Sequence, residues 1–523
     1  MQKKLAATLT GGFLGLVFVL NSSIAGAEAA TEVKYPGLRL PVSTNMPVGS
    51  VLYYDHLDKL DGMGYITDML YGAKPYSRMD MARWTMQARS KADTKQTPAY
   101  LERMISELEA ELQPEIKAWE AYRAGEETGH GDSLRLHEIS VSGVYSESPR
   151  EGYAYDAPAG AAYHPFSSYN NGYHYGHNGS LVVKGYLAGN LGREVALSAS
   201  PRLSYIFDDK GSVALEEGYF AGRTGIFRIE AGKQALLWGQ GSEGTLGLSN
   251  NARPLTMLKI TTEERPKNRG LLAFLGKTRW SVFAGQLEGN RSDFSHPYLV
   301  GIRGDLLYDN LNIGFERLSM LGGTGNAFRA GDIGDWLVGR NAYSNDKWND
   351  IAGIDIKYRF PGVHIYGELY GEDQAHAFPS EKGYSGGLYF PQLTPEGRMD
   401  LRIEGAYTRN PWYVHGTYHS GWTYHHDILG DAMGRKAYRV YAGVNCYLGE
   451  NDILGFNGLH LQSGREKNTA LKNNQAWVDY THRFNASDSL QMTLGAATLN
   501  GIKVPGTDSR IDKFAKVTWS RRF

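Results

Sequence analysis

From about residue 134 to its last residue, this chain alternates apolar and polar side chains with a period of two. In the stretch 195–207, for example, Val195, Leu197 and Leu203 alternate with Ser198 and Arg202. A β-strand directs successive side chains to opposite faces, so each such segment predicts a strand with one oily and one polar face. The same alternation recurs at residues 227–231, 311–316, 354–360 and 490–496. Strands of this kind fit the wall of a membrane barrel, between lipid and a polar lumen, and they also fit a soluble sandwich.

The start of the sequence favours the membrane barrel, because it has the features of an export signal. Lys3 and Lys4 precede an apolar run at residues 11–20 that is too short to span a bilayer as a helix. Small residues follow, so we expect a signal peptide over residues 1–27, with cleavage at 27 or 29; the alternative is a membrane anchor. Beyond this segment the sequence has no run of about 18 apolar residues, which predicts no transmembrane helix.

The composition agrees with a barrel and excludes a bundle of membrane helices. The chain has 64 Gly, 34 Tyr and 10 Trp in 523 residues, and its mean hydropathy of -0.41 is far too low for such a bundle. Aromatic residues at both membrane interfaces are typical of barrels. The net charge of -1 argues against a nucleic-acid partner. The single cysteine, Cys446, excludes an internal disulfide.

The last residues of the sequence predict a closing strand. Counting back by two from Phe523 gives Arg521, Trp519, Val517 and Ala515 on one face. An alternating strand that ends in Phe resembles the assembly signal of bacterial outer-membrane barrels, with Trp519 and Phe523 as its main residues. Arg521 departs from the pattern, at a cost of about 0–1 kcal/mol near an interface. We therefore expect the barrel-assembly machinery as a partner, together with outer-membrane lipid.

Helical periodicity replaces the alternation between residues 51 and 124. Ser77 is placed to cap a helix, and Leu101, Ile105 and Leu108 repeat at helical spacing before Pro114 kinks or ends the run. We expect a helical periplasmic segment at residues 28–130, packed at the mouth of a barrel formed by residues 131–523. At roughly 10 residues per strand, the barrel part holds about 16–18 strands.

The connections between strands are of two lengths. Residues 208–211, 361–362 and 485–488 predict short turns, whereas 146–178, 321–350 and 371–397 predict long polar loops. Short turns on the periplasmic side and long loops outside are the rule in these barrels.

Two aromatic and polar clusters suggest sugar binding, which needs flat apolar faces and planar hydrogen-bonding groups. Residues 412–427 contain Tyr418, Trp422 and Tyr424, and residues 163–175 contain Tyr173. The alternative is an aromatic girdle with ordinary loop packing. The alternation in 412–427 predicts a strand, which would turn half of this cluster toward lipid.

A third candidate is the polar stretch 249–254. Asn250, Asn251 and Arg253 supply amide and guanidinium donors that suit an acidic glycan, and Arg253 suits a bidentate carboxylate contact. The competing interpretation, slightly favoured, is a structural loop folded into the barrel and held by hydrogen bonds.

Motifs for catalysis and metal binding are weak. Ser385 lies in a Gly-x-Ser-x-Gly match, but strand-like residues follow it where a hydrolase needs a helix. His415, His419, His425 and His426 lie in a segment of strand periodicity, where a metal-binding spacing is looser than on a helix. Glu372 and Asp373 are adjacent, so they point to opposite faces of a strand. We expect no enzyme activity, no cofactor and no metal.

An ordered series of short motifs resembles the Wzi family of capsule-assembly outer-membrane proteins. The series runs from about Tyr53 to the end of the sequence, and its motifs are Leu237-Trp238-Gly239-Gln240-Gly241, Leu248-Ser249-Asn250-Asn251-Ala252-Arg253-Pro254, Gly322-Gly323-Thr324-Gly325, Ala352-Gly353-Ile354-Asp355, Tyr370-Gly371-Glu372-Asp373, His419-Ser420-Gly421-Trp422 and Ile428-Leu429-Gly430. The resemblance implies an eighteen-stranded antiparallel barrel with a helical bundle at its periplasmic end. It also implies a lectin-like activity that holds capsular polysaccharide at the cell surface.

These observations together predict a transmembrane antiparallel β-barrel in the outer membrane of a Gram-negative-type bacterium. The expected function is that of a non-catalytic lectin for capsular or extracellular polysaccharide. The alternative is a porin or channel for small solutes, and the third hypothesis is an outer-membrane hydrolase.

The closing strand generates the first testable prediction. Deleting Phe523 is expected to slow insertion, because the terminal aromatic residue belongs to the assembly signal. The measurement is the yield of heat-modifiable barrel in isolated membranes, and a yield equal to that of the unaltered protein would contradict the assignment.

Overall fold

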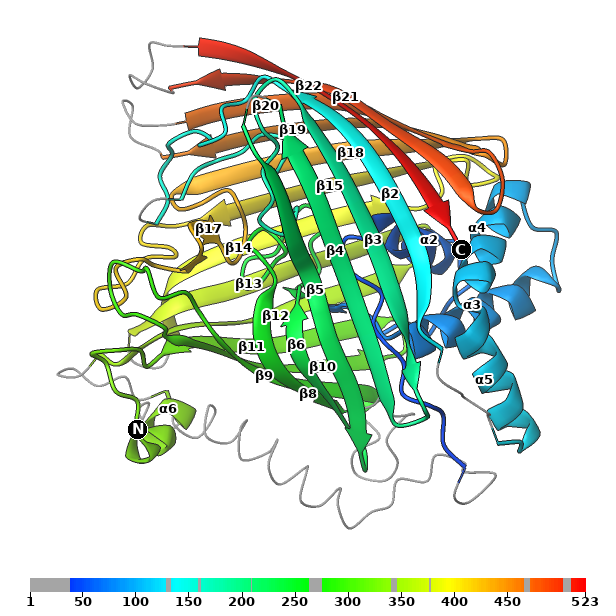
Figure 1. The fold of residues 1–523 in the computed structure, drawn as a ribbon, viewed down its shortest axis with the longest axis horizontal. Helices are drawn as coiled ribbons and strands as arrows, with labels where there is room; N and C mark the ends of the chain where they lie inside the picture. Colours follow the sequence, from blue (N-terminus) through cyan, green and yellow to red (C-terminus); the bar gives the residue numbers. More distant parts are fainter. Residues whose placement is uncertain are drawn as a thin grey trace.

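The structure, a computed structural model, describes residues 38–127, 133–158, 161–207, 209–262, 275–339, 346–375, 378–464, 471–501 and 509–523. The signal peptide predicted at residues 1–27 lies outside these described residues. An 18-stranded antiparallel sheet forms a barrel, and four helices gather at one of its ends (Figure 1). We call this end the helix end and the opposite one the loop end.

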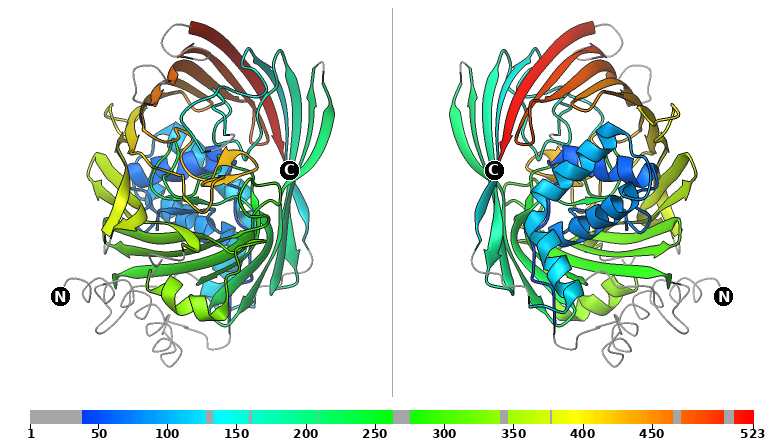
Figure 2. Two further views of the ribbon diagram at one scale, coloured as in Figure 1. Left: turned by 90° about the vertical axis from the view of Figure 1, so that its left-hand side faces the viewer. Right: turned by 90° about the vertical axis from the view of Figure 1, so that its right-hand side faces the viewer.

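Eighteen strands make up the wall, in agreement with the expected barrel. Each strand pairs with its neighbours along the chain, β22 pairs with β2, and β9 lies beside β10 to complete the ring (Figure 2). The strands are β2 (Arg135–Ser146), β3 (Ser180–Leu191), β4 (Val195–Ile206), β5 (Gly211–Thr224), β6 (Phe227–Gln234), β8 (Leu255–Thr262), β9 (Lys277–Gln286), β10 (Tyr298–Tyr308), β11 (Leu311–Leu321), β12 (Trp348–Phe360), β13 (Val363–Ala375), β14 (Phe378–Phe390), β15 (Met399–Thr408), β18 (Ala437–Leu448), β19 (Asp452–Ser463), β20 (Leu471–Arg483), β21 (Asp488–Asn500) and β22 (Ser509–Arg522).

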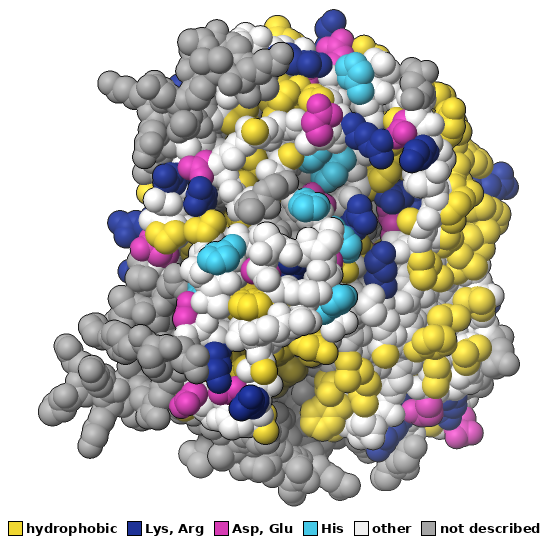
Figure 3. Space-filling model, turned by 60° about the vertical axis from the view of Figure 1, so that its left-hand side comes forward, with side chains coloured by type: hydrophobic (Ala, Val, Ile, Leu, Met, Phe, Trp, Pro, Cys, Tyr) yellow, Lys and Arg dark blue, Asp and Glu magenta, His cyan; other side chains and the backbone are white. Residues whose placement is uncertain are grey.

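The alternation of the sequence becomes the inside and the outside of this wall. On β4, Leu203 and Tyr205 are exposed on the outer face, and on β22 Val517 and Trp519 are. A band of apolar side chains covers the wall in Figure 3. An outer surface of this kind suits lipid. Arg202 of β4 and Asp512 and Lys516 of β22 lie on the luminal face, whereas Lys513 and Arg521 of β22 are charged exceptions on the outer face. Among the described residues, no helix has the length and apolar character needed to cross a membrane.

Four helices form the segment at the helix end: α2 (Val51–Gly62), α3 (Arg78–Ala92), α4 (Ala99–Glu111) and α5 (Gln113–Ala124). Ser77 caps α3, since its side chain accepts a hydrogen bond of 3.0 Å from the backbone N–H of Asp80. Leu112 separates α4 from α5, and Pro114 lies in the first turn of α5, where its missing N–H costs nothing. The predicted helices are therefore present, and Pro114 marks the break between two of them.

Ion pairs and ring contacts fasten the helices to the barrel. The Lys59 ammonium group is buried 3.3 Å from the Asp400 carboxylate and also donates to the carbonyls of Pro391 and Gly397. Other contacts between the helices and the wall are Asp61 with Arg359 at 2.7 Å, Glu107 with Arg483 at 2.7 Å, Glu111 with His137 at 3.0 Å, and the stacked rings of Tyr100 and Tyr447, whose centroids are 4.7 Å apart. Because these charges are buried, each needs its partner, so the helices hold one position on the barrel.

Two of the predicted loops differ in the structure. Residues 371–397 were expected to form a long polar loop, but β13 and β14 run through most of this stretch and form a hairpin. The expectation was wrong because polar residues on the luminal face of a barrel strand look like a loop in the sequence. The short turn predicted at residues 208–211, of which 208 lies outside the described residues, falls between β4 and β5 at the loop end rather than at the helix end.

The surroundings of His56 predict that the docking of the helices depends on pH. Its Nε2 atom lies 2.8 Å from the Glu107 carboxylate, and the side chains of Arg483 and Arg522 face the same pair. Burial lowers the pKa of His56 to about 4. Burial also acts to raise the pKa of Glu107, but the hydrogen bond with His56 and the Arg483 charge bring it to about 2.

Acidification is expected to weaken the docked state. A histidine that is neutral when docked takes up a proton on release, so its contribution is complete above about pH 6.5 and is lost as the pH falls to about 4. The loss amounts to about 3 kcal/mol. Far-UV circular dichroism of the folded protein is expected to show that the melting temperature of the helices falls over this pH range. In His56→Gln, which lacks this titrating group, the melting temperature should fall less over this range, while the exposed control His177→Gln keeps the original profile. Equal profiles in all three proteins would refute the role of His56.

Candidate functional site

Three loops fold back into the lumen instead of projecting from the barrel. We call them loop A (147–179), loop B (235–254) and loop C (409–436); they follow β2, β6 and β15 (Figures 1 and 2). Short strands occur in loop B, β7 (Leu237–Trp238), and in loop C, β16 (Thr423–Tyr424) and β17 (Asp427–Ile428). Buried residues of all three loops join residues of the wall in one hydrophobic core. The lumen therefore contains a packed plug, and we call the three loops the inner loops.

Carboxylates of the wall hold the backbone of the inner loops. Glu368 accepts hydrogen bonds from the backbone N–H groups of Gln240, Gly241 and Leu246 at 2.7, 3.0 and 3.1 Å. Glu404 accepts from Ser242 and Glu243 in the same way, at 2.8 and 3.2 Å. Peptide groups without a partner are costly in a closed interior. The acidic luminal face of β13 and β15 thus supplies the acceptors that loop B lacks.

Loop B also pairs with the helical segment. The two-residue strand β1 (Ala73–Lys74) reaches into the barrel and pairs with β7, and the N–H of Gly239 donates to the carbonyl of Gly72 at 2.8 Å. The helices and the plug therefore contact each other directly inside the wall.

Asn250 and Asn251 join loop A to loops B and C. The Asn250 side-chain amide donates to the Tyr169 carbonyl at 2.7 Å, and that of Asn251 donates to the Ile428 carbonyl at 2.9 Å. Their backbone carbonyls accept the N–H groups of Asn171 and Gly172. Both side chains are buried, at 8% and 7% exposure. This placement agrees with the structural interpretation of these two residues, and glycan binding by them stays a prediction.

Tyr418 and Trp422 lie at the centre of the plug. Each is 0% exposed. Tyr418 donates to the carbonyls of Gly322 and Lys347 at 3.0 and 3.1 Å, and Trp422 donates to the carbonyl of Gly247 at 2.9 Å. The strand predicted for residues 412–427 is thus a loop folded inward, and none of this cluster forms an outward-facing half. In this conformation neither ring presents a face to a sugar, so their direct contact with glycan stays a prediction without support from their position.

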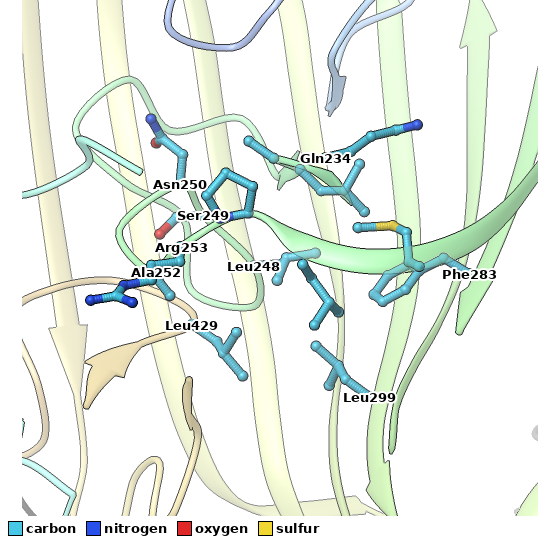
Figure 4. A pocket seen from close by; sticks show the side chains of 14 residues that line it. Gln234, Leu248, Ser249, Asn250, Ala252, Arg253, Phe283, Leu299 and Leu429 are labelled. Atoms are coloured by element: carbon cyan, nitrogen blue, oxygen red, sulfur yellow. The ribbon is translucent and has the colours of Figure 1, made fainter. Parts of the chain in front are cut away.

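Arg253 is placed differently, at the exposed edge of loop B. Its guanidinium group points away from the apolar side chains of Leu248, Phe283 and Leu299, which surround a small cavity of about 20 Å³ (Figure 4). The side chain is exposed, and it makes no hydrogen bond or ion pair with the part of the chain that the structure describes. Loop A comes very close to it at Gly172, where a Cβ atom would lie 2.5 Å from Arg253 Cγ and where φ is +64°. Glycine is therefore required at this contact.

Other cations and aromatic rings surround Arg253. Arg202, from the luminal face of β4, and Lys233 of β6 lie within electrostatic range of it, as do Tyr424 and His425 of loop C. We call these residues, with Tyr173 and Lys184, the basic patch. The Arg202 guanidinium lies 3.9 Å from the centre of the Tyr173 ring. Figure 3 shows Lys, Arg and His side chains side by side on this face of the molecule.

The electrostatics of the basic patch favour an anion. Arg202 and Lys184 share one carboxylate, Glu216, at 3.1 and 3.2 Å, so a single negative charge faces two cations there. Burial and the neighbouring Arg253 charge lower the pKa of His425, so this imidazole stays neutral to a lower pH than an ordinary histidine. Asp427, which bonds to His174 at 2.8 Å, and Glu288 lie in the same region, and the Arg253 guanidinium remains available to a further carboxylate or phosphate group.

Sequence reasoning missed Arg202, Lys184 and Lys233. They lie on β3, β4 and β6, and the period-two pattern that predicts these strands does not single out the three cations. The inward folding of loops A and B, which precede β3 and follow β6, brings Tyr173 and Arg253 beside these strands.

The weak catalytic and metal motifs are separate from the basic patch. Ser385 lies within β14, in the barrel wall, and not at a turn from a strand to a helix. His415, His419, His425 and His426 all lie in loop C, and the described residues include no group of three or more potential metal ligands.

Comparison with known proteins agrees with this architecture. A family model described as capsule assembly protein Wzi matches residues 155–512, more than half of the chain. The chain belongs to the Wzi family. The resemblance seen in the sequence motifs is thereby confirmed.

Two relatives indicate how far the similarity extends. The solved structure of Wzi, an outer-membrane protein involved in group 1 capsule assembly in Escherichia coli and described as a carbohydrate-binding β-barrel, is 18% identical. The match covers 92% of this chain and 99% of that one, with a TM-score of 0.66, so the two share a fold. An uncharacterized 55.8 kDa protein in the cps region of Klebsiella pneumoniae is 26% identical over 169 residues, which is 31% of this chain and 33% of that protein. The chain thus spans about a third of the length of this curated relative.

The contact of Glu368 with loop B generates a prediction about the plug. Glu368→Gln keeps the shape of the side chain but removes the charge that three N–H groups share, at a cost of about 1–3 kcal/mol. Hydrogen exchange of the amides at residues 240–246 is therefore expected to accelerate by about tenfold or more. Glu450→Gln, in the exposed turn after β18, is the matched control and should leave these rates unchanged. Equal exchange in both variants would show that Glu368 does not hold loop B.

Proposed function

We propose that this chain is an outer-membrane lectin that holds an acidic surface polysaccharide without acting as an enzyme. The observation that carries the proposal is the exposed Arg253 guanidinium, which has no partner among the described residues and lies among cations and aromatic rings. Membership in a family of capsule assembly proteins supports it, and so does the description of the Escherichia coli relative as carbohydrate-binding.

The basic patch supplies the two kinds of contact that an acidic sugar needs. Arg253 binds a carboxylate through two parallel N–H groups, and the half-buried ring of Tyr424 offers an apolar face to the C–H groups of a pyranose. Each contact is weak, but a polymer repeats its acidic residue many times. Repetition raises the effective concentration near the patch, so that the polymer is retained even though one sugar would leave quickly.

The orientation of the barrel follows from the same proposal. The loop end, with Arg253, faces the outside of the cell, and the helical segment lies in the periplasm. Export by a signal peptide and insertion by the barrel-assembly machinery complete the scheme. In the barrel, β22 closes the ring against β2, and the N–H of Phe523 donates to the carbonyl of His137 at 3.1 Å. Phe523 is 67% exposed on the outer surface, where an assembly factor has access to it.

The porin hypothesis has less support. A porin needs an open lumen, whereas the inner loops pack there into one hydrophobic core with the wall. In a planar lipid bilayer the protein is therefore expected to show no steady conductance, and large stable channels would favour the porin.

Arg253 provides the direct test. Arg253→Gln is expected to weaken binding of a purified uronic-acid-containing capsular polysaccharide by about tenfold, because a charge-assisted contact contributes about 1.5–3 kcal/mol. Arg150→Gln is the matched control, since Arg150 is an exposed arginine of loop A that pairs with Asp209 outside the basic patch.

The measurement is surface plasmon resonance on the detergent-folded barrel at two salt concentrations. Binding of the unaltered protein should fall with salt, because the salt screens exposed charges. Equal affinities of the two variants, or affinity that is independent of salt, would overturn the proposed role of Arg253.

A further inference from the structure

A second hollow lies inside the barrel, between the inner loops and a different part of the wall. Its volume is about 230 Å³, more than ten times that of the cavity under loop B. Loop A contributes Tyr163, Phe166, Ser168, Tyr169 and Tyr175; loop B contributes Glu243; and β18 to β22 contribute the luminal side chains Arg439, Gln475, Trp477, Asp479, Thr493, Phe514 and Lys516. We call this hollow the inner cavity.

Aromatic rings form one side of the inner cavity. Phe166 of loop A stacks on Phe514 with centroids 4.8 Å apart and meets Trp477 edge-on at 6.2 Å. Trp477 also lies beside Tyr441, whose ring is nearly parallel to it. The Trp477 side chain is half-buried, points into the lumen and lines the cavity. Aromatic rings are what the C–H groups of a sugar ring pack against.

Polar groups in the inner cavity supply both donors and acceptors. Arg439 is 3% exposed and pairs with Asp431 at 2.8 Å, yet its Nε and Nη1 atoms have no hydrogen-bond partner in the described part of the chain. Buried N–H groups normally have partners, so these two point to a ligand with oxygen acceptors. Asp479 is held in place by Thr493 and Asn457 at 2.6 and 2.9 Å, and Lys516 adds a further donor.

The charges of the inner cavity select against an acidic ligand. Two cations, Arg439 and Lys516, are matched by two carboxylates, Glu243 and Asp479. Asp431 already neutralises Arg439, and Glu404 lies within electrostatic range of Glu243. A further carboxylate would meet like charges, whereas the hydroxyl groups of a neutral sugar donate to carboxylates and accept from Arg439 and Lys516.

We propose that the inner cavity binds a single neutral pyranose residue, with its ring against Trp477 and its hydroxyl groups bonded to Arg439, Asp479 and Lys516. This inference goes beyond the basic patch, which takes an acidic group on another part of the wall. Loop A borders both places, through Tyr173 at the patch and Phe166 at the cavity.

The test measures monosaccharide binding to the whole folded barrel by saturation-transfer NMR, in a detergent without a sugar headgroup. The probes are glucose, galactose and glucuronate. At least one of the two neutral sugars is expected to bind, more tightly than glucuronate. Trp477→Leu should weaken this binding roughly tenfold because it removes the ring face, and Lys516→Met should weaken it as well.

Trp280→Leu is the matched control, because Trp280 shares the outward face of β9 with the exposed Val282. It should leave sugar binding unchanged, and so should Arg253→Gln. The inference is overturned if neither neutral sugar binds, if glucuronate binds more tightly, or if Trp477→Leu and Lys516→Met both bind like the unaltered protein. Any of these results leaves the role of Arg253 in polysaccharide binding standing, and failure of Arg253→Gln to affect the polysaccharide leaves the inner cavity standing.

Discussion

Hydrogen bonding of the backbone inside a closed wall governs this structure. In the ring of strands every luminal side chain is free for other contacts, because the ladder between strands already satisfies the peptide groups. Loop B has only the two-residue pairing with β1 and a bridge between Trp238 and Leu248, so its N–H groups between Gln240 and Leu246 depend on side chains of the wall. Glu368 and Glu404 serve this purpose, with five loop N–H groups between them. The acidic luminal face therefore determines the shape of the plug.

The luminal charges are arranged differently on two parts of the wall. The luminal carboxylates of β13 and β15 accept backbone N–H groups of loop B, whereas on β3 and β4 two cations share the single carboxylate of Glu216. Arg253 enters this second region from loop B and remains exposed. The same plug thus separates a basic patch from an inner cavity whose charges are balanced. This separation is the basis of our proposal that the two places bind acidic and neutral sugars.

The alternation of the sequence predicted the wall well, because the side chains of a barrel strand face the lipid and the lumen in turn. Leu203 and Tyr205 point outward as their parity required. The same rule failed for residues 412–427, where the alternation of aromatic and small residues belongs to a loop packed inside the plug. Tyr418 and Trp422 were chosen for their aromatic rings, and both are fully buried. Sequence alone does not distinguish a ring that stacks on a sugar from one that fills a core.

Sites formed by residues from several strands could not be predicted from the sequence, for a different reason. Arg202 and Lys233 are separated by 31 positions, and they lie near Arg253 because β4, β5 and β6 are neighbouring strands and loop B folds inward. Trp477 and Phe166 are further apart still, and their contact depends on loop A entering the lumen. Arg253 was recognisable because its neighbours Asn250 and Asn251 already marked a polar turn. Its exposure has a structural cause: these two amides hold the turn against loops A and C, and that leaves the guanidinium group as the member of the motif that is free to contact another molecule.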